Sequence, residues 1–344
     1  MILEQKPEAH IMSIPNKKNT AATDLIKIIS QAKSVLITGH VRPDGDSVGC
    51  MIALAHLLNK ADITAVATAE KKGLGGPQFL SGVKQMITPK SAARKKFDLL
   101  ITVDCGSLDR VPKELHSILK TTTVINIDHH RTNTRFGDYN FVHGESSSTG
   151  ELIWKISRKA GWQQDNISAE ALWVALITDT GRFAYDMTSP LTMRCGADLL
   201  SCGVRTAYIN DQLYCSFSRI NMELKRRAFR SLNVTENNTI ASVTLSGRDF
   251  EETGGTKADA EDIIEIPRSL IDNKVAIFFY GSEDNAETRI SLRTREPLDA
   301  TTLIAQFEGG GHARAAGCTI TEPLSKAKRI MNLAIKKWMA EQET

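Results

Sequence analysis

The chain contains the stretch Thr123-Val124-Ile125-Asn126-Ile127-Asp128-His129-His130, an apolar run that ends in one carboxylate and two imidazoles. Burying such groups at the end of a strand is costly unless each one has a partner, because their lost hydration must be offset. A bound metal ion supplies that partner. The stretch therefore predicts a buried β-strand that carries metal ligands at its carboxyl end.

Two earlier apolar runs end in the same way. Residues 34–38 lead into Gly39-His40-Val41-Arg42-Pro43-Asp44-Gly45-Asp46, and residues 98–103 lead into Asp104-Cys105-Gly106. The parallel strands of an open α/β sheet bring their carboxyl ends to one crevice, where such folds bind ligands. We therefore expect these polar side chains to lie together at one edge of a parallel sheet.

The first half of the chain alternates strand and helix patterns. Strands are expected at residues 34–38, 63–68, 98–103 and 123–127, and helices at residues 21–33, 47–60, 111–119, 152–159 and 169–177. The helices show apolar residues at i, i+3 and i+4, and the strands are short apolar runs. This alternation predicts a doubly wound parallel α/β sheet with right-handed crossovers.

The second half begins with a helical, charge-rich segment that has no strand pattern. We expect a helical linker over residues 187–232, between a catalytic domain at residues 22–186 and a smaller α/β domain at residues 233–344. In the smaller domain, strands are expected at residues 239–245, 274–280, 288–293 and 318–321, and helices at residues 258–270, 300–307 and 324–341. A length of 344 residues also favours two domains over a single core.

The composition is that of an ordinary globular protein, with 41% hydrophobic and 24% charged residues. Neither a signal-peptide pattern nor an apolar run of about twenty residues is found, so a cytoplasmic protein without a membrane span is expected.

The six cysteines form no C-x-x-C pair, which favours free thiols. A net charge of +3 argues against an extended nucleic-acid surface, and the cluster Lys225-Arg226-Arg227 is interpreted as a solvated helix face.

The polar residues at these strand and helix ends form a carboxylate-rich set with a minority of histidines. Its members are His40, Asp44, Asp46, Asp104, Asp128, His129, His130 and Asp179. Oxygen-dominated ligation with some imidazole suits Mn²⁺ or Mg²⁺, and the cysteine ligands of a structural zinc site are missing. A single Asp or His of this kind is usually a turn or core residue, but several at successive strand ends favour a metal site.

Two further stretches admit both a structural and a binding interpretation. Ser148 with Glu151 fits a helix capping box, whereas the hydroxyls of Ser148 and Thr149 beside helix N-terminal amides also fit a phosphate site. Gly309-Gly310-Gly311-His312 fits a flexible turn between a helix and a strand. Because glycines carry no Cβ, the same stretch would let backbone amides approach a phosphate.

The four metal-ligand stretches resemble the motifs of the DHH phosphoesterases. They are His40-x-x-x-Asp44-x-Asp46, Val103-Asp104-Cys105, Asp128-His129-His130 and Thr178-Asp179-Thr180-Gly181, in this order along the chain. Gly309-Gly310-Gly311-His312-x-x-Ala315-Ala316-Gly317 is similar to the signature of the DHH-associated C-terminal substrate domain. The resemblance covers roughly residues 22–340, and it is strongest to the bacterial bifunctional oligoribonuclease and 3′-phosphoadenosine 5′-phosphate phosphatase branch, the NrnA type.

This resemblance implies two divalent cations, with Mn²⁺ expected ahead of Mg²⁺, that share one bridging carboxylate. The implied ligands are His40, Asp44 and Asp104 for one cation and Asp46, Asp104, His129 and Asp179 for the other. Such a pair of ions activates water at neutral pH and stabilises the attacking and leaving oxygens of an in-line displacement. Asp104 is thereby also a catalytic residue, because it lies on both ions.

The resemblance implies further roles around the phosphate. His130 would act there as a donor or proton carrier, and Asp128 would orient a neighbouring ligand. Substrate binding is expected from Gly309, Gly310, Gly311 and His312, with Arg293 gripping a second phosphate or stacking on a base.

The implied activity is hydrolysis of short oligoribonucleotides to 5′-mononucleotides together with dephosphorylation of 3′-phosphoadenosine 5′-phosphate. A cyclic di-AMP or linear dinucleotide (pApA) phosphodiesterase shares every motif and remains open as an alternative. A RecJ-like single-strand exonuclease is disfavoured, because only 6% of residues are aromatic and few could stack successive bases. A pyrophosphatase and a non-catalytic nucleotide sensor are the remaining alternatives, and the oligomeric state, including a homodimer, is left open.

Overall fold

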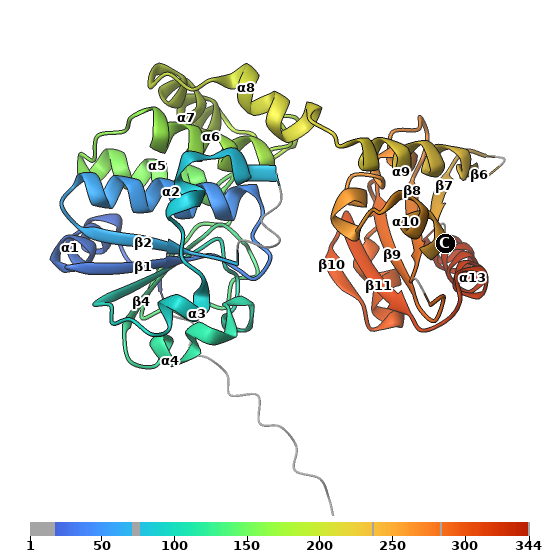
Figure 1. Cartoon of the computed structure of the whole chain (residues 1–344), viewed down its shortest axis with the longest axis horizontal. Coiled ribbons are helices and arrows are strands. Elements are labelled where there is room, and N and C mark those ends of the chain that lie inside the picture. The colour runs from blue at the N-terminus through green and yellow to red at the C-terminus, as the bar shows by residue number, and fades with distance from the viewer. Residues whose placement is uncertain (1–17, 71–75, 236, 283, 343–344) are drawn as a thin grey trace, which may run out of the picture. The chain divides into compact units, whose positions relative to one another are not determined.

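The computed structural model describes residues 18–70, 76–235, 237–282 and 284–342. The chain forms two compact units, coloured blue to yellow and yellow to red in Figure 1, that divide after Ser216. This division falls inside residues 187–232, the segment for which a linker is predicted. The helices α7 (Pro190–Ser201) and α8 (Thr206–Asn210) belong to the first unit, and α9 (Arg219–Arg230) belongs to the second.

The first unit is built on a five-stranded parallel sheet with the strand order β2-β1-β3-β4-β5. The strands are β1 (Ser34–Thr38), β2 (Thr64–Thr68), β3 (Leu99–Val103), β4 (Thr123–Asp128) and β5 (Tyr139–Val142). The predicted parallel α/β fold is confirmed, and β5 is an additional strand. The order reverses between β1 and β3, and in open α/β sheets ligands bind outside the carboxyl ends of the strands at such a reversal.

Helices cover both faces of this sheet (Figure 1). One face carries α1 (Ala22–Gln31), α2 (Gly45–Lys60) and α5 (Thr149–Ala160), and the other carries the short α3 (Pro89–Ala92) and α4 (His116–Leu119). The strands send alternate apolar side chains into the two cores, so both of their faces are buried. This double burial explains why the strands are continuous apolar runs in the sequence.

A second helical layer lies over α2 and α5. It consists of α6 (Asn166–Asp179), which α7 covers in turn. Every residue of α6 from Ser168 to Ile177 is buried, as expected for a helix that is apolar on all sides. This burial fixes the position of the carboxyl end of α6, where Asp179 lies.

Several short segments complete the first unit. They are the 3₁₀ turns Gly76–Phe79, Ser81–Gln85, Leu108–Arg110 and Lys113–Leu115 and the π-helical turn Asp211–Cys215. The helix predicted over residues 111–119 is therefore a 3₁₀ turn followed by the single turn α4. Pro112 is the N-cap residue of this 3₁₀ turn.

The second unit contains a six-stranded mixed sheet with the order β10-β11-β9-β8-β7-β6, in which β7 and β8 are parallel and the other pairs antiparallel. Its strands are β6 (Asn233–Val234), β7 (Ile240–Leu245), β8 (Val275–Gly281), β9 (Thr288–Thr294), β10 (Gly310–His312) and β11 (Ala315–Ile320). β6 and β10 add to the four predicted strands. This unit is α/β, as predicted.

Helices flank the mixed sheet on both faces. Besides α9 they are α10 (Gly247–Thr253), α11 (Glu265–Arg268), α12 (Ala300–Ile304) and α13 (Leu324–Gln342), with 3₁₀ turns at Lys257–Ala260 and Ala305–Phe307. One core forms under α12 and α13, and the other forms under α9, α10 and α11. The helix predicted over residues 258–270 is broken into a 3₁₀ turn and α11, which contains Pro267.

Among the residues that the structure describes, no helix has the length and apolar character needed to cross a membrane.

Candidate metal centre

Every predicted metal ligand lies at the carboxyl edge of the parallel sheet of the first unit. The loop after β1 carries His40, and the start of α2 carries Asp44 and Asp46. The ends of β3 and β4 bring in Asp104 and His129, and the end of α6 brings in Asp179. The ligand atoms of His40, Asp44 and Asp104 lie within 4.8 Å of one another, and so do those of Asp46, His129 and Asp179.

The first group consists of His40, Asp44 and Asp104. Nε2 of His40 lies 3.4 Å from Oδ2 of Asp104 and 3.8 Å from Oδ2 of Asp44. The other ring nitrogen, Nδ1, donates to the carbonyl oxygen of Val41 at 2.8 Å, which turns Nε2 toward the carboxylates. Asp44 also caps α2, because its Oδ1 accepts the Ser47 amide at 3.1 Å.

The second group consists of Asp46, His129 and Asp179. Nε2 of His129 lies 3.0 Å from Oδ2 of Asp179 and 3.9 Å from Oδ2 of Asp46. Nδ1 of His129 donates to the carbonyl oxygen of Ser146 at 3.2 Å, so the imidazole presents Nε2 to the carboxylates. Both histidines are thus held in the tautomer that suits a metal ligand.

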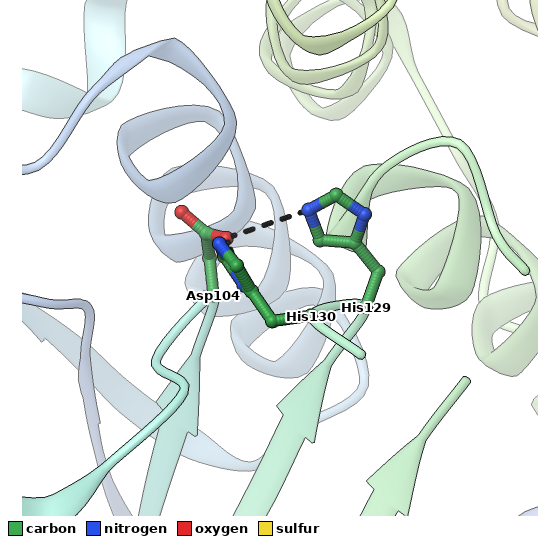
Figure 2. A group of neighbouring side chains, drawn as sticks. All are labelled: Asp104, His129 and His130. Atoms are coloured by element: carbon green, nitrogen blue, oxygen red, sulfur yellow. Dashed lines mark ion pairs between the residues drawn. The ribbon is translucent and has the colours of Figure 1, made fainter. Parts of the chain in front are cut away.

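Asp104 connects the two groups. Its Oδ2 faces His40, and its Oδ1 lies 3.9 Å from Nε2 of His129, as the dashed line in Figure 2 marks. The residue is 2% exposed, and Oδ2 is buried without a hydrogen-bond partner among the described residues. Its φ of 51° is in the left-handed region, which is strained for a residue with a Cβ and is typical of functional sites.

The electrostatics of the cluster favour a bound cation. Burial and the neighbouring Asp179 raise the pKa of Asp46 to about 7, and burial with Asp46 and Asp44 raises the pKa of Asp104 well above its ordinary value. Burial alone would lower the pKa of His129, but Asp179 and Asp46 raise it to about 10. Crowded buried carboxylates and an unpartnered oxygen are therefore compensated best by divalent ions, and the donor set fits them.

Asp128 and His130 lie beside the cluster and form a pair of their own. Nδ1 of His130 donates to Oδ1 of Asp128 at 2.8 Å, and Nδ2 of Asn133 donates to Oδ2 at 2.5 Å. Burial raises the pKa of Asp128, but these two partners hold it below its usual value. Figure 2 shows the rings of His129 and His130 beside Asp104, and Nδ1 of His130 lies 3.6 Å from Oδ1 of Asp104.

Asn133 is a site residue that sequence reasoning missed. It bridges Asp128 and the Cys105 carbonyl at the end of β3, to which Nδ2 donates at 3.1 Å. A single asparagine in a loop carries no periodic or spacing signal, so only its position reveals the role. Cys50 was missed for the same reason; its Sγ donates to Oδ1 of Asp46 at 3.2 Å.

The amino end of α5 holds Asp46. The amides of Thr149 and Gly150 donate to Oδ2 and Oδ1 of Asp46 at 2.7 and 2.9 Å. The expected cap is present in part, because Oγ of Ser148 accepts the amide of Glu151 at 3.1 Å. Ser148 and Thr149 are both fully buried. The structure thus assigns these amides to Asp46, and the phosphate contact of the two hydroxyls stays a prediction.

Glu151 does not return its side chain to Ser148, as a complete capping box would require. Its carboxylate instead accepts from Ser147 and Thr192, each at 2.8 Å, and pairs with Lys155 at 2.7 Å. Lys155 also donates to Oγ of Ser146 at 3.1 Å. This buried network fixes the loop at Ser146, whose carbonyl orients His129. It also fixes the amino end of α5, whose amides hold Asp46.

The predicted substrate residues of the second unit lie on neighbouring strands. Gly310 and His312 of β10 are opposite Gly317 and Ala315 of β11, and Ala315 is in turn opposite Arg293 of β9. The backbone of His312 therefore lies in the same row of the sheet as Arg293. The side chain of His312 lies outside the described part of the structure.

The three glycines of this stretch differ in their surroundings. A Cβ on Gly309 would lie 2.3 Å from Cγ2 of Ile304, and one on Gly311 would lie 2.3 Å from the carbonyl oxygen of Ala315. Gly311 also has a φ of 150°, which side chains disfavour. A Cβ on Gly310 would contact nothing within 4 Å. Close packing thus requires the outer two glycines, and Gly310 leaves the backbone accessible.

Comparisons with known proteins match both units. The family model described as "DHH family, N-terminal domain" matches residues 34–177, and the DHHA1 domain matches residues 237–341. The bifunctional oligoribonuclease and PAP phosphatase NrnA of Bacillus subtilis is 25% identical over 87% of this chain and 93% of its own length. The protein of the same name from Thermus thermophilus is 27% identical over 83% of this chain and 84% of its own length.

Solved structures share the fold. An exopolyphosphatase-related protein from Bacteroides fragilis, 23% identical, covers 94% of this chain and 97% of its own with a TM-score of 0.87. RecJ of Thermus thermophilus, solved in complex with Mn²⁺, is 12% identical and covers 93% of this chain and 54% of its own with a TM-score of 0.55. With a DHH N-terminal domain followed by a DHHA1 domain, the chain belongs to the DHH family and is a hydrolase of phosphoester bonds.

Proposed function

We propose that this protein hydrolyses short oligoribonucleotides to 5′-mononucleotides and removes the 3′-phosphate of 3′-phosphoadenosine 5′-phosphate. The observation that carries the proposal is the pair of ligand groups joined by the buried, strained Asp104. The substrate class is supported by relatives named bifunctional oligoribonuclease and PAP phosphatase, which are 25% and 27% identical over most of this chain.

The residues would hold two divalent cations, with Mn²⁺ ahead of Mg²⁺ because imidazole and carboxylate ligands are mixed. His40, Asp44 and Asp104 would hold one cation, and Asp46, Asp104, His129 and Asp179 would hold the other. When bound, such ions lower the pKa of water and neutralise charge on the phosphate.

The side chains next to the ligands would orient the phosphate and move its protons. His130, whose Nδ1 is fixed by the buried Asp128, would contact the phosphate as a donor or proton carrier. Asn133 keeps Asp128 in place, and the Ser146 carbonyl keeps His129 in its orientation. These contacts prepare the geometry before substrate arrives, which lowers the cost of reaching the transition state.

The second unit would bind the nucleotide that carries the free 5′-phosphate. The accessible backbone at Gly310 can approach phosphate oxygens, and His312 follows two residues later on the same strand. Arg293 lines a cavity of about 350 Å³ together with Tyr280 and Lys257, a mixture of cationic and aromatic side chains that suits a nucleotide.

A cyclic di-AMP or linear dinucleotide phosphodiesterase is the second candidate. The cyclic-di-AMP phosphodiesterase GdpP of Bacillus subtilis is 25% identical over 90% of this chain, although the match spans 49% of its own length. The experiment that separates the two activities is turnover by purified protein with Mn²⁺ on 3′-phosphoadenosine 5′-phosphate, diadenylate, a five-mer RNA, cyclic di-AMP and pyrophosphate. Highest kcat/KM for 3′-phosphoadenosine 5′-phosphate or the five-mer RNA supports the proposal. Highest kcat/KM for cyclic di-AMP, or turnover confined to diadenylate, favours the second candidate, and highest kcat/KM for pyrophosphate contradicts both.

His312→Ala is expected to weaken substrate binding without releasing metal. Loss of a charge-assisted hydrogen bond should raise the transition-state free energy by about 1–3 kcal/mol, and kcat/KM should fall accordingly. The matched control is Arg314→Ala, which removes a nearby side chain that pairs with Glu296 at 2.8 Å. Steady-state kinetics and a Mn²⁺ titration measure both effects. Loss of metal in the His312 variant would show that this histidine is a ligand and not a substrate contact.

Short RNA is expected to be the preferred substrate. A net charge of +3 supplies no long basic track, so few phosphates are contacted and affinity depends weakly on salt. We expect kcat/KM to be highest for strands of roughly two to five nucleotides, and a labelled ladder from two-mers to thirty-mers measures this. Equal attack on thirty-mers with a steep salt dependence would favour a processive exonuclease and a binding role for Lys225-Arg226-Arg227.

A further inference from the structure

A cavity of about 390 Å³ adjoins the first ligand group of the metal centre, within the first unit. Its walls come from the loops after β1 and β2 and from the segment near Pro112. His40 is both a wall of this cavity and a member of the ligand group. A molecule bound in the cavity would therefore contact the ring that faces Asp104.

Arg42, one of the cations that line the cavity, lies in the loop between β1 and α2 and has an unusual backbone conformation. Arg42 has a φ of 56°, in the left-handed region, and it precedes Pro43. The loop is fixed on both sides of it. The Val41 amide donates to the Arg110 carbonyl at 2.8 Å, the Val41 carbonyl accepts from His40, and Asp44 caps α2. Strain that persists between two ligands is typical of a binding loop.

The chemistry of the walls suits an uncharged nucleoside. Val41, Pro43 and Pro112 supply apolar surface, and Val41 is 45% exposed. Arg42 and Lys113 are exposed cations without an ion pair in the described part of the chain, and a guanidinium can stack on a base or donate to it.

Two acids also line the cavity, and they narrow the choice of ligand. The two negative charges of Glu70 and Glu114 balance the two positive charges of Arg42 and Lys113. The cavity therefore has no net positive charge to attract a terminal phosphate. The volume of about 390 Å³ lies within the usual range for small-ligand sites and can accept a base with its ribose. The cavity therefore favours a neutral nucleoside over a nucleotide with a free phosphate.

We propose that this cavity binds the nucleoside on the far side of the scissile phosphate, the one joined to it through its 5′ oxygen. The inference rests on the proposed function. In hydrolysis of a 5′-phosphorylated diadenylate, water adds its oxygen to phosphorus, the bond from phosphorus to the 3′ oxygen breaks, and that oxygen takes a proton. The second nucleoside stays on the phosphorylated product, so the cavity holds it before and after the reaction.

The two substrates of the proposed function differ in this nucleoside. A 5′-phosphorylated diadenylate has a second nucleoside beyond the scissile phosphate, whereas 3′-phosphoadenosine 5′-phosphate ends at the phosphate itself. The cavity thus contributes to recognition of oligonucleotides and not to recognition of the mononucleotide. It would set the balance between the nuclease and phosphatase activities of one metal centre.

The test compares kcat/KM for these two substrates in Arg42→Ala, Val41→Phe and wild type. Arg42→Ala removes the cation that contacts the base, and Val41→Phe fills the cavity from an exposed wall without altering the carbonyl that holds His40. The ratio of kcat/KM for diadenylate to that for 3′-phosphoadenosine 5′-phosphate should fall about tenfold in both variants. Arg94→Ala, an exposed arginine elsewhere in the first unit, should keep the wild-type ratio.

Each outcome separates this inference from the proposed function. A Mn²⁺ titration with wild-type stoichiometry in both variants shows that the ligands near Arg42 are intact. If wild type hydrolyses both substrates and the variants keep the wild-type ratio, or lose both activities equally, the cavity does not bind the second nucleoside. If wild type hydrolyses neither substrate, the proposed function fails and the inference fails with it.

Discussion

Asp104→Asn is expected to abolish phosphoester hydrolysis. Asparagine has the size of aspartate but lacks its charge, and its amide group would place a donor where both groups need an anionic oxygen. Because Asp104 faces His40 with one oxygen and His129 with the other, the substitution weakens both groups at once. Turnover should fall by more than about 100-fold, the upper end of losses seen when only outer-shell partners of metal ligands are removed.

Controls distinguish this loss from damage to the fold. Asp98→Asn changes a carboxylate just before the amino end of the same strand, where it accepts the Lys33 and Ser34 amides at 3.0 Å, and should leave metal binding intact. Without metal, the Asp104 variant should unfold at no lower temperature than wild type, because it lacks one of several crowded buried carboxylates. Near-normal turnover or unchanged metal stoichiometry in Asp104→Asn would contradict the assignment of a shared ligand.

Removal of divalent cations is expected to end turnover and to make stability fall as pH rises. The pKa of Asp46 is raised from 3.8 to about 7 in the fold, so between these values the folded state binds a proton that the unfolded state has lost. The contribution of the Asp46 carboxyl to the free energy of unfolding is therefore complete below about pH 4 and is lost as pH rises to about 7. Because the pKa of His129 is raised from 6.5 to about 10, this residue extends the loss of stability over the same range of pH.

The size of this effect can be measured by thermal unfolding in chelator at several pH values. A carboxyl shifted from 3.8 to about 7 corresponds to a change on the order of 4 kcal/mol, shared here with the other groups of the cluster. Adding Mn²⁺ should restore both turnover and Tm at pH 7 and above. A Tm that is independent of pH between 5 and 8 in chelator, or that does not respond to Mn²⁺, would contradict the electrostatic description of the site.

The sequence predicts the strands that carry ligands because two signals coincide there. The run from Thr123 to Ile127 contains the β-branched aliphatic residues Val124, Ile125 and Ile127, which favour a buried strand, and Asp128 and His129 mark its carboxyl end. The short strand β5 carries no such pair of signals, since Tyr139–Val142 spans only four residues and no predicted ligand follows it. Its pairing with β4 depends on tertiary contacts that local patterns do not contain.

The partners of the ligands are harder to predict than the ligands themselves. Ser148 and Glu151 match a local capping pattern, but the helix amides that follow hold Asp46, which lies more than one hundred residues earlier in the chain. Glu151 likewise contacts Thr192, on a helix that packs against α6. Such long-range contacts leave no spacing in the sequence, so patterns indicate candidate metal ligands but not the residues that orient them.

The central claim is that two divalent cations share Asp104 at the carboxyl edge of the parallel sheet. Anomalous diffraction at the manganese edge from crystals grown with Mn²⁺ tests it most directly. We predict two peaks, one among His40, Asp44 and Asp104 and the other among Asp46, Asp104, His129 and Asp179, with Asp104 bound to both. A single peak, or two peaks that do not share Asp104, would contradict the account.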